Sequence, residues 1–242
     1  MGRPLGQHFL FQRSILERIA ASALPAPPPL CIEIGPGPGA LTELLLERTE
    51  RLVAVELDPA LADNLRRRYA GEPRFSLLEG NVLETELRGM GPAVVCGNIP
   101  YYITSPIIER ALALGPELIR AVFLIQKEVA DRLAAEPGSR DYGYLTVATQ
   151  ALCAVEKLFV VKPASFRPPP KVDSAVVRLT PHAEPLVADY AAFRRFASQC
   201  FRQKRKTLRN NLGRADIPYA GMRAEQLTLA QLAELFQALR AR

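Results

Sequence analysis

The sequence of 242 residues lacks several features that would assign a protein to a common class. It has no run of about eighteen apolar residues that could span a bilayer, and its first residues lack the apolar core of a signal peptide. We therefore expect a cytoplasmic protein without a membrane partner. The chain is 48% hydrophobic, which at this length predicts one full core and room for a small second domain.

Signatures of metal binding and of hydrolytic catalysis are also absent. The two histidines, His8 and His182, stand in no motif that resembles a nucleophile elbow or a catalytic triad. The four cysteines lie far apart, without a C-x-x-C pair or a nearby histidine; they are Cys31, Cys96, Cys153 and Cys200. We interpret all four as reduced structural residues and expect no metal.

The charge is unevenly distributed along the chain. Residues 1–182 contain 20 Lys+Arg and 20 Asp+Glu, whereas residues 183–242 contain 11 Lys+Arg and 5 Asp+Glu, so the net charge of +6 lies in the last quarter. A polyanionic partner would therefore contact this C-terminal segment. The alternative is a solvated helix face.

The hydrophobic pattern predicts a doubly wound α/β fold. A helix is expected over residues 14–24, and the prolines at 25 and 27–29 end it. Short apolar runs then alternate with helix-length amphipathic segments. The expected strands are residues 30–34, 52–56, 75–79, 93–96 and 121–125. Strands this apolar, separated by helices, indicate a parallel sheet that is covered on both faces, as in Rossmann-like domains.

The end of the chain has a different character. Residues 154–161 and 174–179 are rich in strand-forming residues and could pair antiparallel at the sheet edge. Beyond residue 181 the pattern predicts helices, notably over residues 190–209 and 228–239. We therefore expect an α/β domain at 1–182 and a small helical domain at 183–242.

Three glycines follow the first expected strand, in the segment Glu33-Ile34-Gly35-Pro36-Gly37-Pro38-Gly39. A side chain in this turn would block the approach of a ligand to the backbone. The G-x-G-x-G spacing differs from the G-x-G-x-x-G that binds a dinucleotide pyrophosphate, which disfavours an NAD-dependent enzyme. S-adenosylmethionine has no phosphate and carries positive groups, so its pocket can tolerate Glu33. The alternative is a glycine-rich turn without a ligand.

Two polar residues follow the next strands at the same sheet edge. Glu56 stands at the interval from Gly39 expected for the acid that accepts both ribose hydroxyls of a nucleoside cofactor, although it could instead cap a helix. Asn81 ends the third strand, where its amide oxygen could accept the amino group of the cofactor's adenine. An ordinary turn asparagine is the equal alternative.

The fourth strand is followed by the most specific motif, Asn98-Ile99-Pro100-Tyr101. Adenine N6 is a poor nucleophile because its lone pair is delocalised into the ring. Acceptors at its N–H groups, here the Asn98 oxygen and a backbone carbonyl oriented by Pro100, would favour a localised lone pair. Tyr101 supplies a flat surface for an extruded base. The motif therefore predicts methylation of an exocyclic amine.

These motifs resemble the ribosomal RNA adenine N6,N6-dimethyltransferase family over nearly the whole chain. Asn-Ile-Pro-Tyr is typical of methyltransferases that act on exocyclic amines, and its combination with Gly6-Gln7-His8-Phe9-Leu10 is specific to this family. Residues 126–133 and 165–174 also match. The segments 101–107 and 166–174 are more similar to the small-subunit enzyme than to the antibiotic-resistance branch that methylates the large subunit.

The resemblance implies a function and a set of site residues. It implies transfer of two methyl groups from S-adenosylmethionine to N6 of each of two adjacent adenosines in a hairpin loop of small-subunit (16S) ribosomal RNA, by direct displacement, during ribosome biogenesis. The implied cofactor contacts are His8, Leu10, Gly35, Glu56, Asn81 and Asn98. The family commonly has Asn at the place of His8 and Asp at the place of Asn81.

The resemblance also implies how RNA is bound. Phe166 would stack on the target adenine opposite Tyr101, whereas an aromatic side chain among prolines commonly packs in a core, and the proline-rich segment could bind another domain. The basic run becomes a surface that contacts the phosphates of ribosomal RNA or of an assembling small subunit. Its residues are Arg202, Lys204, Arg205, Lys206 and Arg209. We expect a monomer. The remaining alternatives are a large-subunit methyltransferase and a non-catalytic assembly or transcription factor.

Overall fold

The computed structural model describes residues 7–240, so Gly6 lies outside the described residues. The chain divides into two compact units, Met1–Ala130 with Glu156–Thr180 and Asp131–Val155 with Pro181–Arg242. The chain passes from one unit to the other after Ala130, Val155 and Thr180, and the last of these positions is close to the expected division near residue 182. Residues 131–155, which the sequence pattern assigned to the first domain, belong to the second unit.

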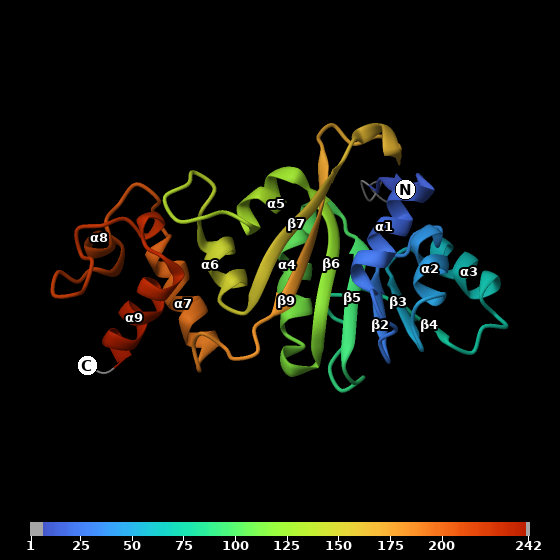
Figure 1. Cartoon of the computed structure of the whole chain (residues 1–242), viewed down its shortest axis with the longest axis horizontal. Coiled ribbons are helices and arrows are strands. Elements are labelled where there is room, and N and C mark those ends of the chain that lie inside the picture. Colours follow the sequence, from blue (N-terminus) through green and yellow to red (C-terminus); the bar gives the residue numbers. More distant parts are fainter. Residues whose placement is uncertain (1–6, 241–242) are drawn as a thin grey trace. The chain divides into compact units, whose positions relative to one another are not determined.

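The first unit is built on a seven-stranded sheet, which confirms the predicted doubly wound α/β class. The strand order is β4-β3-β2-β5-β6-β9-β7 (Figure 1). The strand bounds are β2 Cys31–Ile34, β3 Leu52–Glu56, β4 Phe75–Glu79, β5 Ala93–Asn98, β6 Leu118–Gln126, β7 Cys153–Val161 and β9 Ser174–Pro181. Strands β4, β3, β2, β5 and β6 are parallel, and β9 is antiparallel to β6. The carboxyl ends of the parallel strands therefore meet at one edge.

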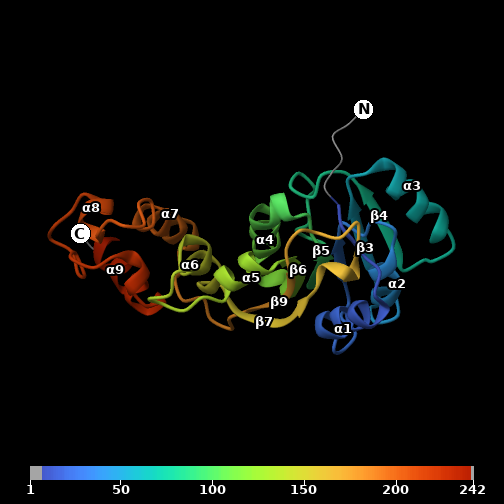
Figure 2. The same cartoon turned by 90° about the horizontal axis from the view of Figure 1, so that it is seen from above.

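Helices cover both faces of this sheet, so all residues of the central strands β2 and β3 are buried and, apart from Glu33 and Glu56, apolar. Helix α1 (Arg13–Ala23) packs on α2 (Ala40–Leu46) and contacts β6, while α4 (Thr104–Leu112) lies on the opposite face (Figure 2). This enclosure holds the strand ends, and the loops that follow them, in fixed positions.

The second unit is helical and has its own core. Helix α5 (Lys127–Leu133) begins in the first unit and ends in the second. The other helices of the second unit are α6 (Tyr144–Gln150), α7 (Tyr190–Cys200), α8 (Leu208–Leu212) and α9 (Leu229–Arg240). Phe193, Phe196 and Phe236 pack against one another in its centre. Tyr142 and Val147 also belong to this core, which is why residues 131–155 group with the C-terminal helices.

Three expectations about the fold can be compared with the structure. The single helix expected over residues 190–209 is wrong, because α7 ends at Cys200 and the chain turns before α8 begins at Leu208. The four cysteines are free and buried, as expected. Within residues 7–240, no helix is long and apolar enough to cross a membrane.

Candidate active site

A short antiparallel ladder brings the N-terminal segment to the carboxyl edge of the sheet. Strand β1 (Phe9–Leu10) pairs with β8 (Phe166–Arg167), with Leu10 opposite Phe166. Just before β1, the Nδ1 atom of His8 lies 2.8 Å from the carbonyl oxygen of Pro168. The carbonyl can only accept, so the imidazole donates this hydrogen bond. The ladder therefore fixes His8 and Leu10 in place.

The glycine turn between β2 and α2 has the backbone conformation that its sequence predicts. Gly35, Gly37 and Gly39 all have positive φ, at +66°, +58° and +86°. A Cβ atom on Gly37 would lie 2.9 Å from the ring of Phe9. Both the conformation and the space therefore require glycine here. The amide of Gly35 also donates to the carbonyl of Val55 at 3.0 Å, which ties the turn to β3.

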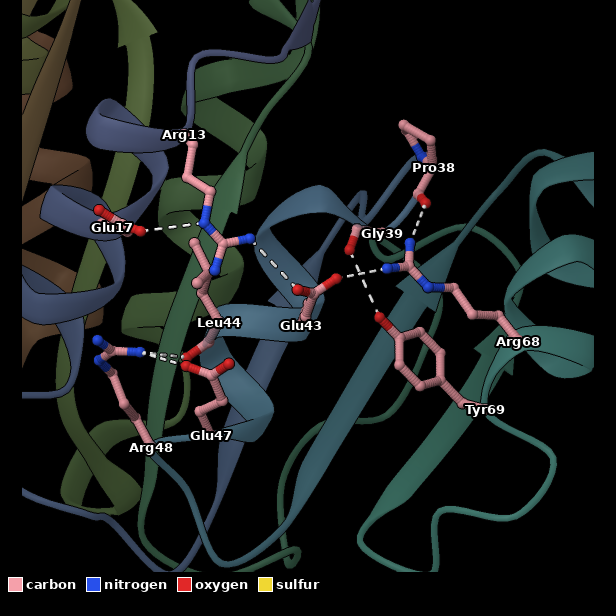
Figure 3. Close-up of polar contacts among 10 residues, drawn as sticks. All are labelled: Arg13, Glu17, Pro38, Gly39, Glu43, Leu44, Glu47, Arg48, Arg68 and Tyr69. Atoms are coloured by element: carbon pink, nitrogen blue, oxygen red, sulfur yellow. Dashed lines mark hydrogen bonds and ion pairs between the residues drawn. The ribbon is translucent and has the colours of Figure 1, made fainter.

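Charged side chains support this turn from outside (Figure 3). Arg68, the last residue of α3 (Pro59–Arg68), donates to the carbonyl of Pro38 at 3.2 Å and pairs with Glu43 at 2.5 Å. Glu43 stands between two arginines, because Arg13 of α1 lies 3.3 Å from its other oxygen. Such exposed pairs contribute only about 0–1 kcal/mol each. Their consequence is geometric, since they join α1, α2 and α3 around the turn.

Two buried carboxyl groups lie beneath the turn. Burial raises the pKa of Glu33 to about 8; the neighbouring Thr42 hydroxyl lowers it and the nearby Glu56 charge raises it. Among the described residues, the Oε2 atom of Glu33 has no hydrogen-bond partner. Glu56 accepts the backbone N–H of Gly37 at 3.0 Å and that of Asp58 at 2.9 Å, one on each oxygen. The cap of α3 is Asp58, not Glu56.

The Asn-Ile-Pro-Tyr motif leaves the end of β5 beside the N-terminal segment. The Nδ2 atom of Asn98 donates to the carbonyl of His8 at 2.8 Å. This bond uses the amide nitrogen of Asn98, so the side-chain oxygen is the atom that is available to accept a hydrogen bond. The sequence pattern assigned no role to Gly97. Glycine at this position lets the end of β5 lie close to β2, because a Cβ atom there would lie 2.3 Å from the carbonyl oxygen of Ile34.

The ring of Tyr101 is fixed at two points. Its hydroxyl lies 2.6 Å from the Oγ atom of Ser174, a buried residue at the start of β9. Its face is stacked near the His8 ring, with centroids 5.7 Å apart and planes inclined by 28°. Burial raises the pKa of the Tyr101 hydroxyl, and the Ser174 bond lowers it. The segment 166–174 matches the family in sequence, but nothing in that match predicts the hydrogen bond between Ser174 and Tyr101.

Two expected site residues make other contacts. The Oδ1 atom of Asn81 accepts the N–H of Leu83 at 3.1 Å, and its nitrogen donates to Glu84 at 3.0 Å. This is the turn role that the sequence left open. The side chain of Phe166 is 2% exposed and belongs to the main core with Leu10. Its stacking on a base stays a prediction that would require the ring to leave this core.

Several expected site residues line one open hollow. The lining residues are Gln7, His8, Phe9, Gly35, Gly37, Asn98, Ile99, Pro100 and Tyr101. A second hollow shares Phe9, Gly35 and Asn98 and is also lined by Leu10 and Glu33. The structure therefore brings together the glycine turn, the N-terminal segment and the Asn-Ile-Pro-Tyr motif. In the part of the chain described, no three His, Cys, Asp or Glu side chains are grouped to hold a metal.

The expected RNA-contacting residues lie in the second unit. All five are exposed, and they stand on or next to the turn that joins α7 to α8; they are Arg202, Lys204, Arg205, Lys206 and Arg209. Only Arg209 is within a helix. Most of this run therefore lies outside a helix, and its contact with RNA stays a prediction.

Comparison with known proteins identifies the family. The model described as ribosomal RNA adenine dimethylase matches residues 2–237. This chain belongs to that family. Ribosomal RNA small subunit methyltransferase A of Acidobacterium capsulatum is 42% identical to it over 254 residues, which cover 97% of this chain and 90% of the relative. The resemblance inferred from the motifs is confirmed.

Two crystal structures of this architecture are similar to the whole chain. A dimethyladenosine transferase from Plasmodium falciparum superposes with a TM-score of 0.86 at 26% identity, covering 97% of this chain and 98% of that one. The 23S rRNA methyltransferase ErmE gives a TM-score of 0.75 at 32% identity, covering 96% and 99%. Both comparisons span the two units.

The family establishes the cofactor as S-adenosylmethionine and the protein as an adenine dimethyltransferase. The structure fits this cofactor. Gly35 and Gly37 line one hollow, and Glu33, whose Oε2 atom has no hydrogen-bond partner among the described residues, lines the other. Of the implied contacts, His8, Leu10, Gly35 and Asn98 line the two hollows, whereas Glu56 and Asn81 do not.

Proposed function

We propose that this protein methylates N6 of two adjacent adenosines twice each, in a hairpin loop of small-subunit ribosomal RNA, as a step in assembly of the small subunit. The observation that carries the proposal is the pair of fixed groups at the hollow. Asn98 is oriented by the His8 carbonyl at 2.8 Å, and Tyr101 is held by Ser174 at 2.6 Å. A cytoplasmic, monomeric protein fits this substrate.

The geometry supports a mechanism in which the protein orients the amine and does not form a bond to it. Tyr101 presents its ring to an adenine that has left the RNA stack. The Asn98 oxygen accepts one N6–H, which favours a lone pair directed away from the ring plane. S-adenosylmethionine, when bound, supplies a methyl group activated by its sulfonium. N6 forms a bond to the methyl carbon as the carbon–sulfur bond breaks, S-adenosylhomocysteine is the leaving group, and N6 releases one proton to solvent for each methyl group it gains.

A second transfer to the same nitrogen requires a site that releases its hold on one hydrogen. After the first transfer, N6 carries one hydrogen and one methyl group. Asn98 offers a single acceptor, its side-chain oxygen, and the hydrogen bond from its nitrogen to the His8 carbonyl orients the amide group. The monomethylated amine can therefore rotate and present its remaining hydrogen to the same oxygen. A flat surface at Tyr101 accommodates either orientation.

The choice of the small subunit is supported by the relatives. Proteins named ribosomal RNA small subunit methyltransferase A are 42% and 43% identical to this chain over 97% and 98% of its length. The large-subunit alternative rests on the ErmE structure, at 32% identity. The intact Asn98 to Tyr101 motif argues against a non-catalytic assembly factor, which would have no need to keep its geometry.

Mass spectrometry of digested RNA tests the proposal. Small subunits from cells that lack this modification would be incubated with the protein and S-adenosylmethionine, with large subunits as the matched control. We expect N6,N6-dimethyladenosine at two adjacent positions of the small-subunit RNA alone. N6-monomethyladenosine as the only product at saturating cofactor, or modification confined to large-subunit RNA, would contradict the proposal.

A further inference from the structure

The turn that carries the basic run has a defined conformation although it concentrates like charges. Four cations stand within five residues at positions 202–206. Such a run repels itself and tends to be disordered unless the fold holds it. Here the amide of Arg202 donates to the carbonyl of Gln199 at 3.2 Å, and that of Lys206 donates to the carbonyl of Gln203 at 2.9 Å. Contacts with the rest of the second unit must therefore hold the backbone of this turn.

Asn211 in α8 is the buried group that holds the turn. Its side chain is 6% exposed, and its Nδ2 atom donates to the carbonyls of Cys200 at 2.7 Å and Gln203 at 3.1 Å. The carbonyl of Lys206 lies 3.5 Å away. Three carbonyl oxygens thus converge on one amide nitrogen, so only a donor fits. The opposite oxygen is buried without a partner among the described residues, which indicates that the donor end determines the position.

The cations of the run fall into two kinds. Lys204 donates to the carbonyl of Arg140 and lies 3.9 Å from Glu225, so it braces the turn. The others are exposed and make no ion pair with residues 7–240; they are Arg202, Arg205, Lys206 and Arg209. Unpaired cations on a held backbone are available to an anion without first breaking an existing interaction.

We propose that Asn211 is a positioning residue for RNA, which sets the turn so that Arg205 and Lys206 meet phosphates of the substrate. The inference rests on the proposed function, since it needs an RNA substrate. Its physical basis is preorganisation: a turn already held by Asn211 loses less conformational freedom on binding than a free one. The interaction with phosphate then shows directly in the affinity.

The test compares Asn211→Ala with Asn210→Ala, an exposed neighbour in the same helix. RNA affinity would be measured against salt concentration with small-subunit RNA. Asn211→Ala should reduce the log–log slope by roughly 0.7–1.8, equivalent to the removal of one or two phosphate interactions, while Asn210→Ala keeps the wild-type slope. S-adenosylmethionine binding, measured by calorimetry, should not change in either variant, because the hollow lies in the first unit.

The same substitution in a variant that lacks both cations shows whether Asn211 acts by positioning Arg205 and Lys206 or whether its loss disturbs the structure in general. In Arg205→Gln/Lys206→Gln, adding Asn211→Ala should cause no further loss of RNA affinity, because the cations it positions are gone. An equal loss in both backgrounds, or a wild-type slope for Asn211→Ala, would overturn the proposal. Methylation by the wild-type protein is scored separately, so failure of the proposed function is distinguishable.

Hydrogen exchange on the wild-type protein keeps the proposal testable should Asn211→Ala not fold. The amides of Arg202 and Lys206 should exchange at least about tenfold more slowly than in an unstructured peptide without RNA present, because their hydrogen bonds already exist. Exchange at the unstructured rate would show that the turn is not held and would overturn the proposal.

Discussion

Asn98 illustrates how one side chain can serve two segments of the chain. Its nitrogen holds the carbonyl of His8, 90 residues away in sequence, and its oxygen is left for the substrate amine. The sequence predicted the second role from the motif. It could not predict the hydrogen bond to His8, because the segment that contains His8 is held at the hollow by the pairing of β1 with β8, which lies far away in sequence.

Replacing Asn98 should therefore affect turnover more than cofactor affinity. Asn98→Ala is expected to lower kcat by at least about tenfold, since it removes a preorganised acceptor at N6. Single-turnover methylation and calorimetry with S-adenosylmethionine would be measured on the same preparation. Wild-type turnover in Asn98→Ala would remove this residue from the mechanism.

Glu33 makes stability depend on pH. Burial raises its pKa from 4.5 to about 8 in the folded protein. Between these two values the folded state keeps a proton that the unfolded chain releases, so stability falls as pH rises through this range. The contribution is fully present below about pH 4.5 and is lost as pH passes about 8.

Glu33→Gln should remove this dependence. The amide stays neutral, so the variant should be more stable than the wild type at pH 8, by an amount on the order of a few kcal/mol, and similar to it near pH 4.5. Urea unfolding of both proteins at several pH values would measure the difference. Parallel curves for the two proteins between pH 5 and 8 would show that Glu33 is not buried in its neutral form.

At the scale of elements, the sequence predicted the sheet well and the short ladder not at all. The expected strands at 52–56 and 75–79 match β3 and β4 residue for residue. The fully buried β3 has the apolar run expected of a central parallel strand, whereas β4 lies at the sheet edge and is only partly buried. Strands β1 and β8 have two residues each and join segments about 160 residues apart. No local pattern encodes such a pairing, so the sequence left core packing of Phe166 as an alternative to base stacking and did not indicate that Leu10 would lie opposite it.

The break after Cys200 has a similar cause. The segment from 190 to 212 contains neither proline nor glycine, so its pattern favours one continuous helix. In the structure the chain turns there because the amide of Asn211 satisfies the carbonyls that a continuous helix would have paired. The hydrogen bond to the Cys200 carbonyl comes from a side chain eleven residues away, and periodicity does not reveal it.

The burial of Phe166 leads to a prediction about stability. Phe166→Ala should destabilise the protein by about 3–5 kcal/mol, the cost of removing a large ring from a packed core, and Phe166→Leu by less. Denaturant unfolding would measure both. The stacking role predicts a different result, in which Phe166→Ala is as stable as the wild type and loses only the capture of the target base.

At the scale of the whole molecule, chemistry and charge are divided between the two units. The hollow with Asn98 and Tyr101 belongs entirely to the first unit. The net charge of +6 lies in residues 183–242, all of which belong to the second. This division predicts that RNA affinity can be weakened without any effect on cofactor binding.

Charge removal in the second unit tests this division. Replacing Lys204, Arg205 and Lys206 with glutamine should weaken RNA binding and flatten its dependence on salt, by roughly 0.7–0.9 in the log–log slope for each phosphate that is no longer neutralised. The effect should come mainly from Arg205 and Lys206, because the ammonium of Lys204 already donates a hydrogen bond to the backbone carbonyl of Arg140. Lys204→Gln alone should therefore leave most of the slope in place.

A matched control removes charge from the first unit. Arg66 and Arg74 are exposed and paired with acidic neighbours, so replacing both with glutamine lowers the net charge without removing an unpaired cation. If RNA responded only to overall charge, this double variant would flatten the slope about as much as a double variant at Arg205 and Lys206. We expect the wild-type slope in the first and a reduction of roughly 1.4–1.8 in the second. Equal slopes would mean that the phosphates do not distinguish the turn after α7 from the rest of the surface.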